Sequence, residues 1–256
     1  MIDLTIDDAV ATVVLNNPEK LNALGEQALK DLGAAYDEAE ASGVRALVLR
    51  GEGRAFCAGR DISGVDPRDD DVMGYLGGLV TPLLRRMSVF PAPTFAAAHG
   101  ACLGVGLGLL IATDVVYVAD TAKIGSPFAA LGATLDSGGH ALFFERLGAH
   151  KTLDLIYTGR LMSGTEAVAS GLFSQVLPAD EVLAAAESAA KTAADGATGA
   201  FLASKELVRR LRDERLGLWE SVDHENAAQA ALCDTDDYRE GFAAFQDKRK
   251  PVFRGR

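Results

Sequence analysis

Residues 44–62 read VRALVLRGEGRAFCAGRDI, and this stretch carries most of the information about the fold. Its first six residues are a largely apolar run that predicts a buried strand, which Gly51 and Gly53 close with a turn. Beyond the turn, the small residues Ala58 and Gly59 would let a ligand approach the main chain closely. Taken alone, the second half of the stretch is more typical of a surface turn after a strand than of a binding site.

The sequence on both sides of this stretch alternates between strand and helix patterns. Runs of β-branched and apolar residues predict strands, and apolar residues three and four positions apart predict helices. The expected strands are residues 9–15, 44–49, 94–96 and 115–118, and the expected helices are residues 26–42, 72–88 and 101–112. Apolar strands that alternate with helices indicate an α/β core whose strands are buried on both faces.

From about Ser137 onward the pattern is almost entirely helical, and Asp180 is suited to cap one of these helices. We therefore divide the chain into an α/β core, residues 1–178, and a helical C-terminal region, residues 179–256. The helices expected in the second part are residues 183–194, 198–211, 216–232 and 238–245. Their apolar stripes need a partner, which either the core or a neighbouring subunit would supply.

Composition excludes several classes of function. The 256 residues include 25 Lys+Arg and 36 Asp+Glu, and the net charge of -11 argues against a nucleic-acid partner, which requires a basic face. The cysteines, Cys57, Cys102 and Cys233, are odd in number and widely spaced, and the histidines form no metal-binding pair, which predicts a reduced protein without a metal site. No apolar run is long enough to span a bilayer, so we expect a cytoplasmic protein with no membrane partner.

A second glycine-rich stretch, residues 99–106, reads HGACLGVG. It begins a dinucleotide-binding pattern, but Leu109 stands where the third glycine would be needed. The glycines have two possible explanations. They could allow a helix to pack closely, or they could expose a backbone N–H at a helix start toward a developing negative charge. No serine lies in a nucleophile elbow and no phosphate-binding loop is present, which disfavours hydrolase chemistry.

The stretches 54–62 and 99–106, in this order and some forty residues apart, resemble the enoyl-CoA hydratase/isomerase, or crotonase, family. The similarity covers essentially the whole chain, continuing through residues 122–127, 131–132, 161–167 and 238–245. It implies an α/β fold built as a crotonase-like spiral of ββα units, with a helical C-terminal region that forms a homotrimer or homohexamer. It also implies an acyl-CoA thioester as substrate, with coenzyme A as part of that substrate and no separate cofactor.

The resemblance implies an oxyanion hole for the thioester oxygen, formed by the backbone N–H groups of Arg60 and Val105. Each donor preorganised toward a developing enolate is typically worth about 3 kcal/mol. Many relatives have Gly at the second position, so Val105 departs from the pattern, although a backbone donor does not require Gly.

The positions that hold two glutamates in hydratases of the family are occupied here by Gly108 and Phe128. Hydration of a double bond needs one group to activate water and another to deliver a proton. Because both carboxylates are absent, the resemblance favours isomerisation over hydration.

Residues 131–139, LGATLDSGG, resemble a segment of some isomerases of the family, including the one that acts on ring-epoxidised phenylacetyl-CoA. That resemblance implies that Asp136 shuttles a proton during the reaction. The residues alone favour an N-cap for a helix over 137–147, and the two hypotheses remain open at this point. His140, one helical turn after Asp136, could contact it, and His99 is expected to be structural.

The resemblance also assigns contacts with coenzyme A by position: Lys20, Leu21, Ala58, Asp61, Ile62 and Lys248. The first two flank the nucleotide part, and the next three line the same groove. The last lies in a basic C-terminal end and is expected to reach a phosphate, often across a subunit boundary.

Three functions are compatible with these residues. The leading hypothesis is an isomerase in which the oxyanion hole acidifies the Cα–H group and Asp136 moves the proton. The second is an enoyl-CoA hydratase, a lyase of fatty acid metabolism, whose water is placed by the substrate or by Asp136. The third is a catalytically silent acyl-CoA binding protein that keeps the oxyanion hole and the CoA groove.

Overall fold

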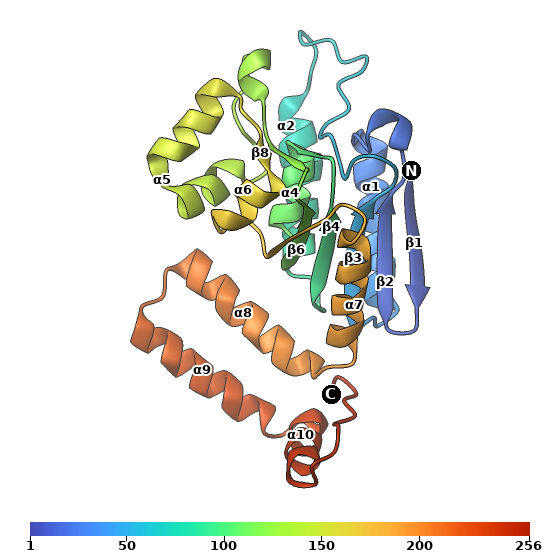
Figure 1. Ribbon diagram of the computed structural model, residues 1–256, viewed down its shortest axis with the longest axis vertical. Helices are drawn as coiled ribbons and strands as arrows, with labels where there is room; N and C mark the ends of the chain where they lie inside the picture. The colour runs from blue at the N-terminus through green and yellow to red at the C-terminus, as the bar shows by residue number, and fades with distance from the viewer.

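The computed structural model describes residues 1–256, and its centre is a six-stranded sheet (Figure 1). From one edge to the other the strands are β1 (Ile2–Asp7), β2 (Val10–Leu15), β3 (Ala46–Gly51), β4 (Thr94–Ala98), β6 (Val115–Ala119) and β9 (Gln175–Leu177). Only β1 and β2 pair antiparallel, and all the other neighbours are parallel. β4 is buried along its whole length, as expected for a parallel strand that is covered on both faces.

A second sheet has three short strands, β5 (Ala101–Leu103), β7 (Lys123–Gly125) and β8 (Met162–Ser163). In two successive units, a strand of the large sheet leads directly into a strand of the small sheet, β4 into β5 and β6 into β7. Helical structure then follows, as α4 (Val105–Ile111) in the first unit and a 3₁₀ turn (Phe128–Leu131) in the second. The chain is therefore a spiral of ββα units, which confirms the predicted fold class.

Helices cover the sheet. α1 (Glu26–Ala41) packs against β1 and β2, and α7 (Val182–Ala194) packs against β3, β4 and β6. Between β3 and β4 the chain forms α2 (Val72–Tyr75), a π-helical turn (Leu76–Val80) and α3 (Thr81–Ser88), where one continuous helix was predicted. α5 (Gly139–Thr158) and α6 (Gly164–Ala169) lie between β7 and β9 along the chain.

The structure corrects four predictions about secondary structure. The helix expected over residues 101–112 begins only at Val105, because residues 101–103 pair with β7 and Gly104, at φ 52°, breaks the chain direction. Asp180 is not an N-cap, since α7 begins at Val182 after Glu181 and has no side-chain cap. The strand expected at residues 44–49 is shifted by two residues, and the chain after Ser137 also contains β8 and β9.

The last three helices project away from the sheet (Figure 1). They are α8 (Thr198–Glu214), α9 (Leu218–Leu232) and α10 (Asp236–Gln246), and each lies close to its predicted range. α7 belongs instead to the layer that packs on the sheet, so it differs from the helices that follow it. None of the helices combines the length and apolar character that a membrane span requires.

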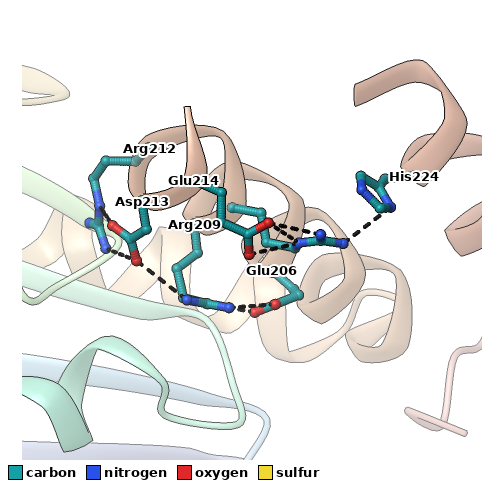
Figure 2. Close-up of polar contacts among 7 residues, drawn as sticks. Glu206, Arg209, Arg212, Asp213, Glu214 and His224 are labelled. Atoms are coloured by element: carbon teal, nitrogen blue, oxygen red, sulfur yellow. Dashed lines mark hydrogen bonds and ion pairs between the residues drawn. The ribbon is translucent and has the colours of Figure 1, made fainter. Parts of the chain in front are cut away.

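Charged side chains link neighbouring turns of α8 and connect it to α9, as Figure 2 shows. Arg210 donates to Glu214 at 2.8 Å and to Nδ1 of His224 at 3.1 Å, and Arg209 donates to Glu206 at 2.7 Å. Exposed pairs of this kind contribute little to stability. The α8–α10 region therefore needs other contacts, and several of its large apolar side chains are exposed: Val208, Leu218, Trp219, Phe242 and Phe245.

Candidate active site

The structure brings the two glycine-rich stretches together, although some forty residues separate them in the sequence. The backbones of Cys57 and Cys102 pair as an isolated parallel β-bridge, and both thiols are free. On either side of it, the N–H of Cys57 donates to the carbonyl of Ala101 at 2.9 Å, and the N–H of Leu103 donates to the carbonyl of Cys57 at 3.0 Å. Residues that follow this bridge in both segments are thereby held side by side.

The peptide of Arg60 is fixed by hydrogen bonds on both sides. The N–H of Leu24 donates to the carbonyl of Gly59 at 2.8 Å, and the N–H of Asp61 donates to the carbonyl of Leu24 at 3.0 Å. Between these two bonds the N–H of Arg60 donates to no acceptor within the protein. It is therefore a backbone donor held in a defined direction and free to bind a ligand.

Val105 supplies the second backbone donor expected at the site. It is the first residue of α4, so its N–H has no acceptor within the helix, and it donates to none outside the helix either. Its side chain is buried in the core. A Cβ atom built on Gly59 would lie 3.0 Å from the carbonyl oxygen of Leu103 and 3.8 Å from the Cα atom of Gly104, which shows how closely the two donor segments approach.

Asp136 does not cap a helix. α5 begins at Gly139 with Gly138 as its N-cap and has no side-chain cap, so the N-cap hypothesis is wrong. Only the backbone carbonyl of Asp136 is used, accepting from the N–H of Gly139 at 2.9 Å. The carboxylate oxygen Oδ1 is buried without a hydrogen-bond partner. Burial raises the pKa of Asp136, and the neighbouring Ser137 side chain and then the charge of the Arg60 guanidinium oppose that rise.

The acidic loop before α2 takes part in this region, which the sequence did not indicate. Asp70 accepts two hydrogen bonds from the Arg60 guanidinium, at 2.5 and 2.8 Å, and Asp71 caps α2 by accepting from the N–H of Gly74. The ring of Tyr75 lies under the guanidinium, 4.2 Å from Cζ to the ring centroid. The two contacts of Arg60 join residues ten and fifteen positions apart, and no spacing rule for loops identifies such pairs.

Gly108 and Phe128, the positions at which the resemblance leads us to expect hydratase glutamates, are closely packed against neighbouring segments. A Cβ atom on Gly108 would lie 2.5 Å from the Cβ atom of Ser137, and a Cβ atom on Gly104 would lie 2.7 Å from the ring of Phe128. The space next to residue 108 is therefore occupied by the chain that carries Asp136, and the Phe128 ring covers the turn before Val105.

The histidines take other roles. His99 Nε2 lies 2.8 Å from the carbonyl oxygen of Gly53, which confirms a structural role. The nearest polar partner of His140 is the hydroxyl of Thr134, 3.4 Å from Nε2, rather than Asp136. Cys57 and Cys102 are buried, and burial raises the pKa of the Cys57 thiol to about 12, so neither is suited to nucleophilic chemistry.

Five of the positions assigned to coenzyme A form one continuous region. Lys20 and Asp61 are joined by an ion pair at 2.7 Å, which lowers the pKa of the Asp61 carboxyl to about 2. The carbonyl of Leu21 accepts from the N–H of Ala58 at 2.9 Å, and the Ile62 side chain is exposed. These residues adjoin the Arg60 peptide.

Lys248 does not belong to this region within one chain. It follows Asp247, the C-cap of α10, and this helix lies at the end of the molecule farthest from the loop that leads into α2 (Figure 1). Contact between Lys248 and a ligand at Lys20 would have to come from another subunit.

Comparison with known proteins shows the family to which the sequence is similar. The sequence profile described as enoyl-CoA hydratase/isomerase matches residues 5–256. A protein of Rhizobium meliloti named "Probable enoyl-CoA hydratase" is 36% identical over 251 residues, which cover 96% of this chain and 95% of that protein. The 1,2-epoxyphenylacetyl-CoA isomerase of Escherichia coli is 30% identical over 256 residues, covering 98% of this chain and 97% of that protein.

Solved structures show the same fold. The enoyl-CoA hydratase of Bacillus anthracis superposes with a TM-score of 0.90 at 27% identity and covers 100% of this chain and 99% of its own. The "putative Enoyl-CoA hydratase/isomerase" of Mycobacterium abscessus superposes with a TM-score of 0.93 at 31% identity, with both chains covered completely. The protein has the crotonase fold. The chain belongs to the enoyl-CoA hydratase/isomerase family.

Proposed function

We propose that the protein is an isomerase of acyl-CoA thioesters. The thioester oxygen binds the N–H groups of Arg60 and Val105, the enolate forms there, and Asp136 moves a proton from Cα to another position of the acyl group. The coenzyme A part lies along the region of Lys20, Leu21, Ala58, Asp61 and Ile62. No separate cofactor is required.

The two free backbone donors support the first step. Each is directed by the surrounding hydrogen bonds before any ligand binds, so little reorganisation is needed when negative charge develops on the oxygen. If both donors bind the same oxygen, they fix its position from two different segments and thereby orient the adjacent Cα–H group.

The unpartnered carboxylate oxygen of Asp136 carries the proposal. A buried acceptor without a partner costs free energy, so a residue that only stabilised the fold would be expected to have its oxygen paired. A raised pKa makes Asp136 a stronger base than an exposed aspartate, which suits proton abstraction from carbon. The charge of the Arg60 guanidinium acts on Asp136, which supports a common site for the carboxyl and the proposed oxyanion donor.

Hydration is the second candidate, because relatives such as the Rhizobium meliloti protein carry the name hydratase. The packing argues against it in this chain. Gly108 has no room for a side chain against Ser137, and Phe128 offers no group that could activate water.

Product analysis tests the proposal. The protein is incubated with a panel of enoyl-CoA and aryl-CoA thioesters, and the products are resolved by chromatography and mass. We expect products of unchanged mass and changed retention. A gain of the mass of water would establish hydration instead, and binding without any product would support the silent acyl-CoA binding protein.

A further inference from the structure

We propose that the Arg60 side chain is a positioning residue: its guanidinium fastens the loop of residues 61–71 and Tyr75 over the peptide whose N–H is the proposed oxyanion donor. The inference rests on the proposed function for its catalytic consequence. Its structural part, the fastening of the loop, is independent of any reaction.

The Arg60 guanidinium contacts Asp70 through its edge and the Tyr75 ring through its face. Its two terminal nitrogens donate to the two carboxylate oxygens of Asp70, at 2.8 and 2.5 Å, in the bidentate geometry that only arginine provides. Its flat face lies 4.2 Å from the centre of the Tyr75 ring. The side chains of Arg60 and Asp70 are only 23% and 17% exposed, so this pair is screened less than a surface pair.

Tyr75 connects the Arg60 guanidinium to the peptide that carries the proposed oxyanion donor. Its hydroxyl donates to the carbonyl of Leu24 at 2.8 Å, the same carbonyl that accepts from the N–H of Asp61 at 3.0 Å. The N–H of Leu24 in turn donates to the carbonyl of Gly59 at 2.8 Å. Arg60 therefore holds, through Tyr75 and Leu24, the hydrogen bonds on both sides of its own peptide, and these bonds set the direction of its N–H.

The same guanidinium acts on Asp136 through its charge. The other ionisable groups that act on Arg60, Tyr75 or Asp136 are Glu26, Cys57, Asp61 and Asp70. Arg60 is the cation among these groups, and its charge favours the ionised form of Asp136. Removing that charge raises the pKa of Asp136, so the acid limb of kcat/KM should move to higher pH.

Hydrogen exchange followed by mass spectrometry tests the fastening directly. Arg60→Met keeps an unbranched apolar stem and the backbone N–H but loses the guanidinium and its ion pair, and we expect faster exchange over residues 61–75. Arg68→Met is the matched control, since the Arg68–Asp66 pair lies in the same loop with Arg68 85% exposed. That variant should exchange like the parent protein.

Kinetics test the consequence for the site. Arg60→Met should lower kcat by about tenfold or more through misplacement of the donor, with little change in affinity for a saturated acyl-CoA that cannot react. Arg60→Lys separates the two roles: it should restore the acid limb of the pH profile, because the charge returns, but not the slow exchange, because an ammonium group cannot pair bidentately with Asp70.

Unchanged exchange over residues 61–75 in Arg60→Met overturns the inference whether or not the parent protein turns over a substrate. With faster exchange, an unchanged kcat and pH profile in an active enzyme would overturn the positioning role. A parent protein that binds acyl-CoA and converts none of the panel would contradict the proposed isomerase, while the exchange experiment would still decide the fastening of the loop.

Discussion

The Cα atom of Gly108 is packed so closely against Ser137 that a Cβ atom on residue 108 would lie 2.5 Å from the Cβ atom of Ser137 and 3.0 Å from its carbonyl oxygen. Gly108 is the position at which family hydratases are expected to carry a glutamate. In this protein Ser137, the residue after Asp136, fills the space beside residue 108, so a side chain at this position would displace the segment that carries Asp136.

Substituting Gly108 by alanine should therefore destabilise the protein. The added methyl group must displace the backbone of Ser137, and overpacking of this kind costs about 1–3 kcal/mol. Gly33→Ala is the matched control, because Gly33 also lies in a helix and its added methyl group would meet only the Leu83 side chain, at 4.0 Å. Chemical denaturation should show a gain of about 0.5–1 kcal/mol for the control, and an equal gain at Gly108 would contradict the close packing.

Asp136→Asn should lower turnover by about 10²-fold or more, because an amide cannot take up the proton. Affinity for a non-reacting acyl-CoA should be nearly unchanged, as measured by titration calorimetry. Asp180→Asn, on an exposed turn, serves as the control and should keep parental activity. Turnover of Asp136→Asn at the parental rate would exclude Asp136 as the proton carrier.

The raised pKa of Asp136 also predicts how stability depends on pH. Because the folded-state pKa lies above the unfolded value, the ionised form is disfavoured by folding, and its cost is relieved as the pH falls through the folded-state pKa. The difference in unfolding free energy, parent minus Asp136→Asn, should become more favourable to the parent as the pH is lowered. A difference that is independent of pH would show that the pKa is not raised.

The Asp136 carboxyl should also determine how activity depends on pH. Asp136 must be ionised to accept a proton, so kcat/KM should fall as the pH drops through its pKa. We expect this acid limb to lie above the ordinary aspartate value of about 3.9 and to be absent from the residual activity of Asp136→Asn. An acid limb at or below that ordinary value in the parent would contradict the burial of the carboxyl.

Acyl-CoA should stabilise the folded protein, since a ligand of the native state adds about 2.7 kcal/mol at a hundredfold excess over Kd. Thermal unfolding with a saturated acyl-CoA, compared with the free carboxylic acid at the same concentration, measures the effect. Lys20→Met should reduce the shift, because Lys20 is the cation of the proposed nucleotide-binding region. No shift with millimolar acyl-CoA would remove the proposed substrate class.

The α8–α10 region should form an interface between subunits, in a trimer or a multiple of it. Phe245, 85% exposed, and Trp219, 77% exposed, lie on helices that project from the sheet. Phe245→Asp should lower the mass measured by light scattering, whereas Tyr157→Asp, at a side chain 75% exposed on α5, should not. A monomeric parent protein would count against the interface and against a contact of Lys248 with a neighbouring subunit's ligand.

The sequence by itself determined the α/β class and the helices α1 and α7–α10, because burial on one helix face or along a strand produces a local pattern of apolar residues. Only the tertiary structure decided that residues 101–103 form a strand, since their partner, β7, lies twenty residues away. The same holds for Asp136: aspartate before a helix is typical of a cap, and only the structure shows that Gly138 is the N-cap and that Oδ1 of Asp136 is buried without a partner. The Arg60–Asp70 pair joins two loop residues whose contact depends on how the loop folds back over the site, and no local pattern records that path.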